Sequence, residues 1–123
     1  MSVTLIVEDN STFRRSLKDM LCARFPEMCV EEAVDGTEAL DKVSVLSPDI
    51  VFMDIKLPGA NGFELTRTIK ARHPDMVVII LTSYDLPEYR EAAHRSGANH
   101  FCTKGNTTGD EITQLVQSVV GPR

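Results

Sequence analysis

Five residues whose side chains can bind cations or phosphate stand where short apolar runs of this sequence end. Glu8 and Asp9 follow the first run, Asp54 follows the third, Thr82 ends the fourth, and Lys104 comes just after the fifth. Carboxylates are hard oxygen ligands for divalent cations, whereas a threonine hydroxyl and a lysine ammonium suit phosphoryl oxygens. These residue types together indicate a site that handles phosphate beside a metal ion.

Each of these residues has a simpler explanation when it is taken alone. Acidic residues at strand ends are commonly solvated or cap helices, and an isolated threonine or lysine is more often a strand-end or surface residue. A site is favoured because four of the five runs end in a group of this kind. Three crowded carboxylates repel one another unless a cation intervenes, and Mg²⁺, which prefers oxygen ligands, is the natural one.

The apolar runs are typical of buried parallel strands, because they are continuous in apolar residues rather than alternating. They occupy residues 3–7, 30–33, 50–53, 77–81 and 100–102. Between them lie segments with apolar residues every three or four positions, which predict helices. The alternation predicts an α/β fold, a (βα)5 chain with a flavodoxin-like doubly wound parallel sheet.

The strand order decides which of these residues meet. Ligands of open parallel sheets bind beyond the carboxyl ends of the strands, where the order reverses. In the doubly wound order 2-1-3-4-5, strands one and three are neighbours. Glu8, Asp9 and Asp54 are then expected to converge. Pro58-Gly59 and Asn61-Gly62 predict a loop after the third strand.

Composition restricts the function further. The 123 residues suit one domain, 1–123, and we expect no output domain in this chain. A formal net charge of −5 offers no basic footprint for direct nucleic-acid binding. No run approaches the roughly 20 apolar residues that span a bilayer, and no signal-peptide pattern is present, so we expect a cytoplasmic protein without membrane attachment. Three cysteines without CxxC spacing predict buried or half-buried free thiols.

The motifs around these residues resemble those of response-regulator receiver domains of two-component signalling. The resemblance covers essentially the whole chain, with the motifs in the family's order and spacing. The matching stretches are Val7-Glu8-Asp9-Asn10, Phe52-Met53-Asp54-Ile55-Lys56-Leu57-Pro58-Gly59, Asn61-Gly62, Leu81-Thr82-Ser83 and Gly97-Ala98-Asn99-His100-Phe101-Cys102-Thr103-Lys104.

The resemblance implies a phosphorylation-controlled signalling domain rather than an enzyme with a separate substrate. Asp54 resembles the family's phosphoacceptor, which takes a phosphoryl group from a sensor histidine kinase and supports its own dephosphorylation. Asp9 resembles the direct Mg²⁺ ligand, and Glu8 acts mainly through a water. The backbone carbonyl of Lys56 resembles the remaining protein ligand.

The resemblance also implies how phosphorylation is read out. Thr82 and Lys104 resemble the pair that holds the phosphoryl oxygens. Phe101 resembles the aromatic switch residue that turns inward as Thr82 moves; the alternative is an ordinary core ring. The family's partner surface, made by the fourth helix, fifth strand and fifth helix, implies a homodimer or a docked output domain. Arg14 and Arg15 are expected on a solvated helix face.

Two further positions bear on how long a phosphoryl group persists. Lys56 stands two residues after Asp54, and Tyr84 stands two residues after Thr82. We expect both side chains to overhang the phosphoryl group, obstruct water and slow dephosphorylation.

One position departs from the family pattern. Most receivers follow the lysine with a proline in a cis peptide bond, but here Gly105 follows Lys104. A cis bond without proline costs about 2.5–4 kcal/mol, so we expect a trans bond. The Lys104-Gly105-Asn106 segment is similar to receivers of the LuxR/NarL-type subclass, which carry helix-turn-helix outputs.

Two other functions fit parts of the pattern. A pseudo-receiver binds partners without being phosphorylated and normally lacks the acceptor, an acid or the lysine, all of which are present here. A metal-dependent phosphohydrolase that forms an aspartyl phosphate typically needs a second acid two residues after the nucleophile. In this chain that position is Lys56.

Overall fold

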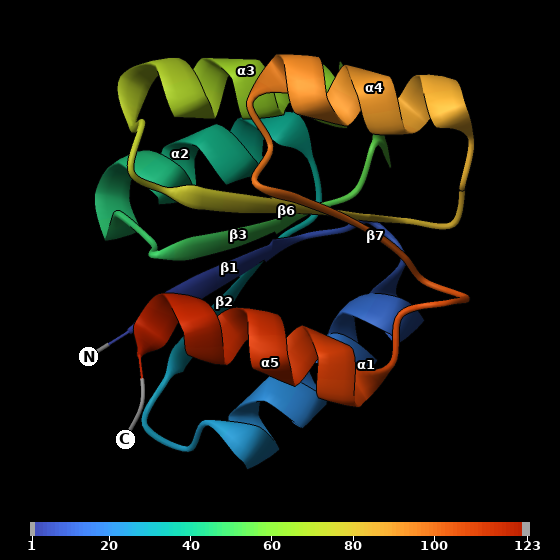
Figure 1. Cartoon of the computed structure of the whole chain (residues 1–123). Helices are drawn as coiled ribbons and strands as arrows, with labels where there is room; N and C mark the ends of the chain where they lie inside the picture. The colour runs from blue at the N-terminus through green and yellow to red at the C-terminus, as the bar shows by residue number, and fades with distance from the viewer. Residues whose placement is uncertain (1, 122–123) are drawn as a thin grey trace.

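The computed structural model describes residues 2–121, which are built around one central sheet (Figure 1). In this part of the chain five strands form the sheet: β1 (Val3–Val7), β2 (Cys29–Ala33), β3 (Ile50–Met53), β6 (Val77–Thr82) and β7 (His100–Thr103). The helices between and after them are α1 (Ser11–Arg24), α2 (Gly36–Leu46), α3 (Gly62–Arg72), α4 (Pro87–Ser96) and α5 (Gly109–Val120). The predicted alternation of strands and helices is confirmed.

The sheet is parallel throughout, in the order β2-β1-β3-β6-β7. The predicted order 2-1-3-4-5 is therefore confirmed, since β6 and β7 are the fourth and fifth long strands. The order reverses between β1 and β3, and their register pairs Val7 with Met53. This pairing brings the residues that follow the two strands to the same edge of the sheet.

A short antiparallel hairpin follows β3, where the sequence predicted only a loop. Its strands are β4 (Lys56–Leu57) and β5 (Ala60–Asn61), which pair Lys56 with Asn61 and Leu57 with Ala60. Gly59 turns the chain with a φ of +66°, a conformation that costs glycine little. The hairpin leads directly into α3.

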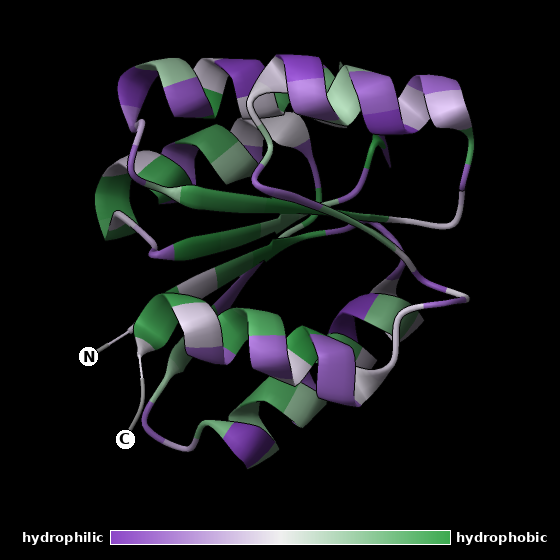
Figure 2. Ribbon diagram, in the orientation of Figure 1, coloured by the Kyte–Doolittle hydropathy of each residue, from purple (hydrophilic) through white to green (hydrophobic). Residues whose placement is uncertain are grey.

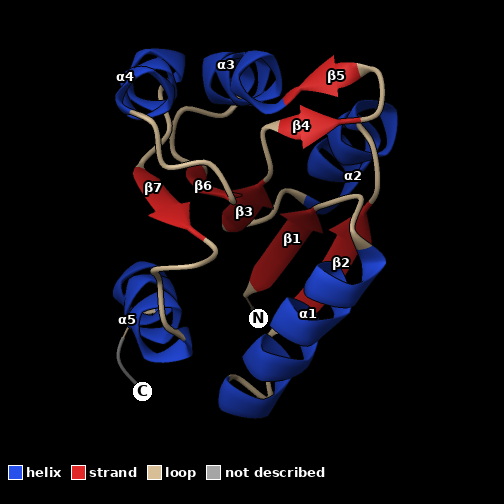
Figure 3. Cartoon of the chain, turned by 90° about the vertical axis from the view of Figure 1, so that its right-hand side faces the viewer, coloured by secondary structure: helices blue, strands red, loops and turns tan. Residues whose placement is uncertain are grey.

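Helices cover both faces of the sheet. α2, α3 and α4 lie on one face, and α1 and α5 lie on the other (Figures 1 and 3). Each layer has its own cluster of buried side chains, and neighbouring strand residues alternate between the clusters: Leu5 and Val7 join the first, and Ile6 joins the second. Both faces of every central strand are thus buried, which explains the continuous apolar runs (Figure 2).

Local signals determine where the helices start and stop. The Asn10 side chain caps α1 by accepting a hydrogen bond from the Phe13 amide at 3.0 Å. Thr108 caps α5 in a capping box with Glu111. α4 has a proline in its first turn and is capped at its end by Gly97, whose φ is +93°, a left-handed conformation that favours glycine at a helix C-terminus.

The peptide bond between Lys104 and Gly105 is trans, as predicted, since no peptide bond among residues 2–121 is cis. Cys102 is buried and Cys29 half-buried, but Cys22 is exposed, contrary to expectation, because it lies on the outer side of α1. None of the helices in the described part of the chain is both long and apolar enough to cross a membrane.

Candidate functional site

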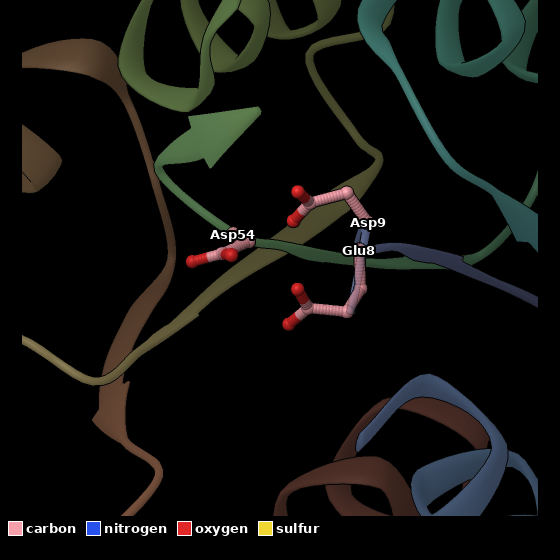
Figure 4. A group of neighbouring side chains, drawn as sticks. All are labelled: Glu8, Asp9 and Asp54. Carbon is pink, nitrogen blue, oxygen red and sulfur yellow. The ribbon is translucent and has the colours of Figure 1, made fainter. Parts of the chain in front are cut away.

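Three carboxylates meet at the carboxyl edge of the sheet. Glu8 directly follows β1 and Asp54 directly follows β3, and the Asp54 amide donates to the Val7 carbonyl at 3.1 Å. One carboxylate oxygen from each of Glu8, Asp9 and Asp54 lies within 4.8 Å of the other two. Figure 4 shows Glu8 and Asp9 extending from the same strand end beside Asp54. Hard oxygen donors this close together can hold a divalent cation such as Mg²⁺.

The three carboxylates differ in their exposure. The side chain of Glu8 is 3% exposed and that of Asp54 is 11% exposed, whereas Asp9 is exposed. Burial, and next the negative charge of Glu8, raise the pKa of Asp54 to about 7, although Lys104 acts in the opposite direction. Asp54 is therefore a carboxylate whose charged form a further cation would stabilise.

Lys104 reaches the same edge from the end of β7. Its backbone amide donates to the Thr82 carbonyl at 2.8 Å, which extends the pairing of β6 and β7 by one step. Its Nζ atom lies 2.5 Å from Oε1 of Glu8 and 3.7 Å from Oδ2 of Asp54. The ammonium is thus inside the site, beside Asp54 but hydrogen-bonded to Glu8.

Thr82 lies at the end of β6, and the loop after it contacts the hairpin that follows Asp54. Its buried hydroxyl accepts a hydrogen bond from the Tyr84 amide at 3.3 Å. The Nζ atom of Lys56, in β4, lies 4.1 Å from the centre of the Tyr84 ring. This cation–π contact joins the segment after Asp54 to the segment after Thr82.

Phe101, in β7, has a half-buried ring that packs against the core cluster beneath α2, α3 and α4. The guanidinium carbon of Arg90, in α4, lies 4.8 Å from the centre of this ring. Nε of Arg90 also donates to Oδ1 of Asp85 at 2.7 Å. Phe101 is therefore covered from outside by a side chain that is tied to the loop between β6 and α4.

Gly62 packs closely against the backbone of Asp54, a contact that the sequence did not predict. A Cβ atom at Gly62 would lie 2.1 Å from the Asp54 carbonyl oxygen and 2.7 Å from the Ile55 Cα atom. The Gly62 amide also donates to the Ile55 carbonyl at 2.9 Å. The pair Asn61-Gly62 indicated a turn, but nothing in the sequence indicated that the turn packs against the backbone of Asp54.

Arg14 is a second supporting residue, and its predicted place on a solvated helix face is wrong. Its side chain is only 14% exposed. The guanidinium donates to the Glu8 carbonyl and to Oε1 of Glu32, both at 2.8 Å. Arg14 turns inward because these two acceptors lie at the ends of β1 and β2, directly beside the first turn of α1, whereas Arg15 remains exposed.

Comparison with known sequences identifies relatives along nearly the whole chain. The family model described as the response regulator receiver domain matches residues 4–117. The DNA-binding transcriptional activator DevR/DosR of Mycobacterium tuberculosis is 37% identical over 120 residues, which cover 97% of this chain and 54% of that protein. Response regulator GacA of Pseudomonas viridiflava is 35% identical over 115 residues, 94% of this chain and 52% of its own length. The chain thus spans about half the length of these relatives.

Solved structures share the fold. A CheY-like response regulator receiver domain protein from Methanospirillum hungatei matches with a TM-score of 0.87 at 26% identity, over 96% of this chain and 92% of that one. A LuxR-family two-component response regulator from Aurantimonas sp. matches with a TM-score of 0.86 at 29% identity, over 98% of this chain and 85% of that one. The sequence and fold comparisons agree on one kind of domain.

Proposed function

The chain belongs to the family of response regulator receiver domains, and from this premise we propose that it is a phosphorylation-controlled signalling domain whose phosphoacceptor is Asp54. One observation carries the proposal. The Asp54 carboxylate has an oxygen within 4.8 Å of oxygens of two other acids, Glu8 and Asp9, and the Lys104 ammonium lies 3.7 Å from it. A phosphoryl group that arrives here meets both a positive charge and a group that can bind a cation, and both stabilise the charge of phosphoryl transfer.

The proposed donor is a phosphohistidine of a sensor histidine kinase. An oxygen of Asp54 attacks the phosphorus atom, the new P–O bond makes an acyl phosphate, and the P–N bond breaks with its electron pair left on the imidazole. Positioning matters more than covalent assistance in such a transfer. Asp54 is oriented for it, because its Oδ1 atom accepts a hydrogen bond from the Ile55 amide at 2.9 Å. We assign Thr82 and Lys104 to the phosphoryl oxygens.

The donor set fits a Mg²⁺ ion. Within residues 2–121, Glu8, Asp9 and Asp54 are the one group of three or more His, Cys, Asp or Glu residues close enough to hold a metal. All its donors are hard oxygens, which suits Mg²⁺. We assign these carboxylates and the Lys56 backbone carbonyl as ligands, with Glu8 acting through a water. When bound, Mg²⁺ supplies positive charge that offsets the carboxylates and the phosphoryl oxygens.

We assign the readout of phosphorylation to Thr82 and Phe101. The Thr82 hydroxyl accepts a hydrogen bond from the Tyr84 amide, a contact that is lost when the hydroxyl moves toward a phosphoryl oxygen. Phe101 then turns inward. The Phe101 ring is half-buried beneath Arg90. This partly exposed position supports the assignment, because the ring can still move further into the core. Such a pair is a two-state element that a new charge can bias.

The signalling partners follow from the same proposal. The surface made by α4, β7 and α5 is assigned to a homodimer or to an output domain. A relative about twice as long is named as a DNA-binding transcriptional activator, but the net charge of −5 does not favour direct DNA binding by this chain. The proposed location is the cytoplasm. Because the domain acts on its own carboxylate and its own phosphoryl group, we class it as a regulatory acceptor rather than an enzyme with separate substrates.

The proposal is tested by incubating the protein with acetyl phosphate and Mg²⁺ and recording its intact mass. We expect the mass of one phosphoryl group to be added, and we expect EDTA to prevent it. Asp54→Asn should take up none, whereas Asp75→Asn, which alters an exposed aspartate remote from the site, should behave as wild type. Addition that persists in Asp54→Asn would overturn the assignment.

A further inference from the structure

Lys104 has a third neighbour in the site besides the two acids. Its Nζ atom lies 4.4 Å from the centre of the Phe13 ring, while it also contacts Glu8 at 2.5 Å and Asp54 at 3.7 Å. A lysine ammonium sits on a flexible four-carbon stem, so its position depends on what surrounds it. The carboxylates attract the Lys104 ammonium, and the face of the Phe13 ring contacts it as well.

The short segment from Glu8 to Phe13 places both residues beside the Lys104 ammonium. Asn10 lies between them and bonds to each: its amide donates to Oε2 of Glu8 at 3.1 Å, and its side chain accepts from the Phe13 amide at 3.0 Å. The Phe13 ring packs against the core cluster beneath α1 and α5. The ring is therefore held in place by the cap of α1 and by the core, independently of Lys104.

The contact lies in a partly buried part of the site. Phe13, Glu8 and Asp54 line one small recess together with apolar side chains such as Leu17 and Phe52. The Lys104 side chain is 16% exposed. A cation over an aromatic face is held more strongly when it is removed from water.

We propose that Phe13 is a positioning residue for Lys104, whose ring holds the ammonium between Glu8 and Asp54, ready for a phosphoryl oxygen. The inference rests on the proposed function. It gives the first turn of α1 a part in phosphoryl transfer that acts through the position of Lys104. The competing explanation is that Phe13 is a core side chain that happens to lie near the lysine.

A double-mutant cycle separates the two explanations. Phe13→Leu keeps an apolar side chain but removes the aromatic face, Phe13→Tyr keeps the face, and Lys104→Met removes the cation. We expect Phe13→Leu to slow phosphorylation by acetyl phosphate about tenfold, the scale of a cation–π contact shielded from water, and Phe13→Tyr to stay near wild type. In the Lys104→Met background, Phe13→Leu should have no further effect. An equal loss in both backgrounds, or no loss in wild type, would overturn the proposal.

A second measurement does not depend on how any Phe13 variant folds. In the wild-type NMR spectrum, the ring current of Phe13 should shift the Hε protons of Lys104 upfield, and Lys104→Met should remove this signal, whereas the Hε signal of Lys56, which lies beside the Tyr84 ring, should remain. Ordinary shifts for the Lys104 Hε protons would sink the proposal. Failure of wild type to take up a phosphoryl group would instead refute the proposed function while the shifted protons remain, so the two failures are distinguishable.

Discussion

The Nζ atom of Lys104 lies 2.5 Å from Oε1 of Glu8, although 96 positions separate the two residues in the chain. Their side chains are only 16% and 3% exposed. This ion pair links the residue that follows β7 to the residue that follows β1. A divalent cation that approaches Glu8 therefore meets a carboxylate that already has a cationic partner.

Lys104→Met should strengthen Mg²⁺ binding. The substitution removes the competing charge and keeps most of the length of the side chain. We expect about threefold to tenfold tighter binding, because like charges a few ångströms apart repel appreciably at a partly buried site. Isothermal titration calorimetry at constant ionic strength measures the affinity.

Arg15→Met is the matched control, since it changes the net charge equally at an exposed position of α1. It should leave the Mg²⁺ affinity within about twofold, because salt screens exposed charges. An unchanged affinity in Lys104→Met, or an equal gain in Arg15→Met, would contradict the competition between the lysine and the metal.

The raised pKa of Asp54 predicts how the stability of the metal-free protein depends on pH. The folded-state pKa is about 7, whereas an unfolded aspartate titrates near about 3.9. Between these values the folded state binds the extra proton, so the free energy of unfolding falls as pH rises, and this loss is complete above about pH 7. Asp54→Asn removes the effect and should become more stable than wild type as pH rises.

Urea unfolding in EDTA, followed by circular dichroism, tests this dependence. The stability difference between Asp54→Asn and wild type should be small near about pH 4 and largest above about pH 7. Added Mg²⁺ should stabilise wild type more than the variant, because it binds the ionised carboxylate. Asp75→Asn should show no such trend. A difference that does not vary with pH would mean that Asp54 titrates normally in the folded protein.

Much of the site was predictable because its residues stand at strand ends. A parallel sheet brings the carboxyl ends of its strands to one edge, so the positions of Glu8, Asp54 and Lys104 in the chain were enough to predict that they lie near one another. The alternation of apolar runs and helical stripes was likewise enough to predict the order of the elements. Neither inference requires the orientation of a single side chain.

The unpredicted features depend on orientations and close approaches. Arg14 and Arg15 are the same residue type at adjacent positions, and only the fold shows that one reaches the Glu8 carbonyl while the other stays in solvent. The spacing of apolar residues along α1 is consistent with Phe13 packing against the core, but it does not indicate that the Lys104 ammonium lies over the ring. The hairpin of β4 and β5 arises from two backbone pairs that are too short for any periodicity to indicate.

Gly62→Ala should disturb the Asp54 backbone. Its Cβ atom would lie 2.1 Å from the Asp54 carbonyl oxygen, and backbone atoms cannot move aside as a flexible side chain can. We expect a loss of stability of about 1–3 kcal/mol, typical of overpacking, together with slower phosphorylation by acetyl phosphate. Chemical denaturation and intact-mass kinetics measure the two effects.

Gly105→Ala provides the comparison, because an added Cβ atom there meets nothing within 4 Å. It should change stability by about 0.5 kcal/mol or less and leave the rate unaltered. If both alanine variants behaved alike, the close approach of Gly62 to Asp54 would have no consequence for the site.

Lys56 and Tyr84 should determine together how long the phosphoryl group persists. The Lys56 ammonium lies 4.1 Å from the centre of the Tyr84 ring, so we expect the two side chains to cover the approach to Asp54 as one unit. We expect Lys56→Asn and Tyr84→Ala each to speed loss of the phosphoryl group about threefold, a barrier change of about 0.7 kcal/mol. The decay of the phosphorylated protein, followed by intact mass after removal of acetyl phosphate, gives these rates.

The double variant distinguishes a joint cover from two separate obstacles. If each side chain obstructed water independently, the increases in dephosphorylation rate from the two substitutions would multiply in the double variant. Because Lys56 contacts the Tyr84 ring, we instead expect the double variant to be little faster than the faster single variant. Leu86→Ala, at a nearby and similarly exposed apolar residue, should leave the decay unchanged. Multiplying rates would show that the contact between Lys56 and Tyr84 is incidental, and unchanged rates in both single variants would show that neither side chain restrains water at Asp54.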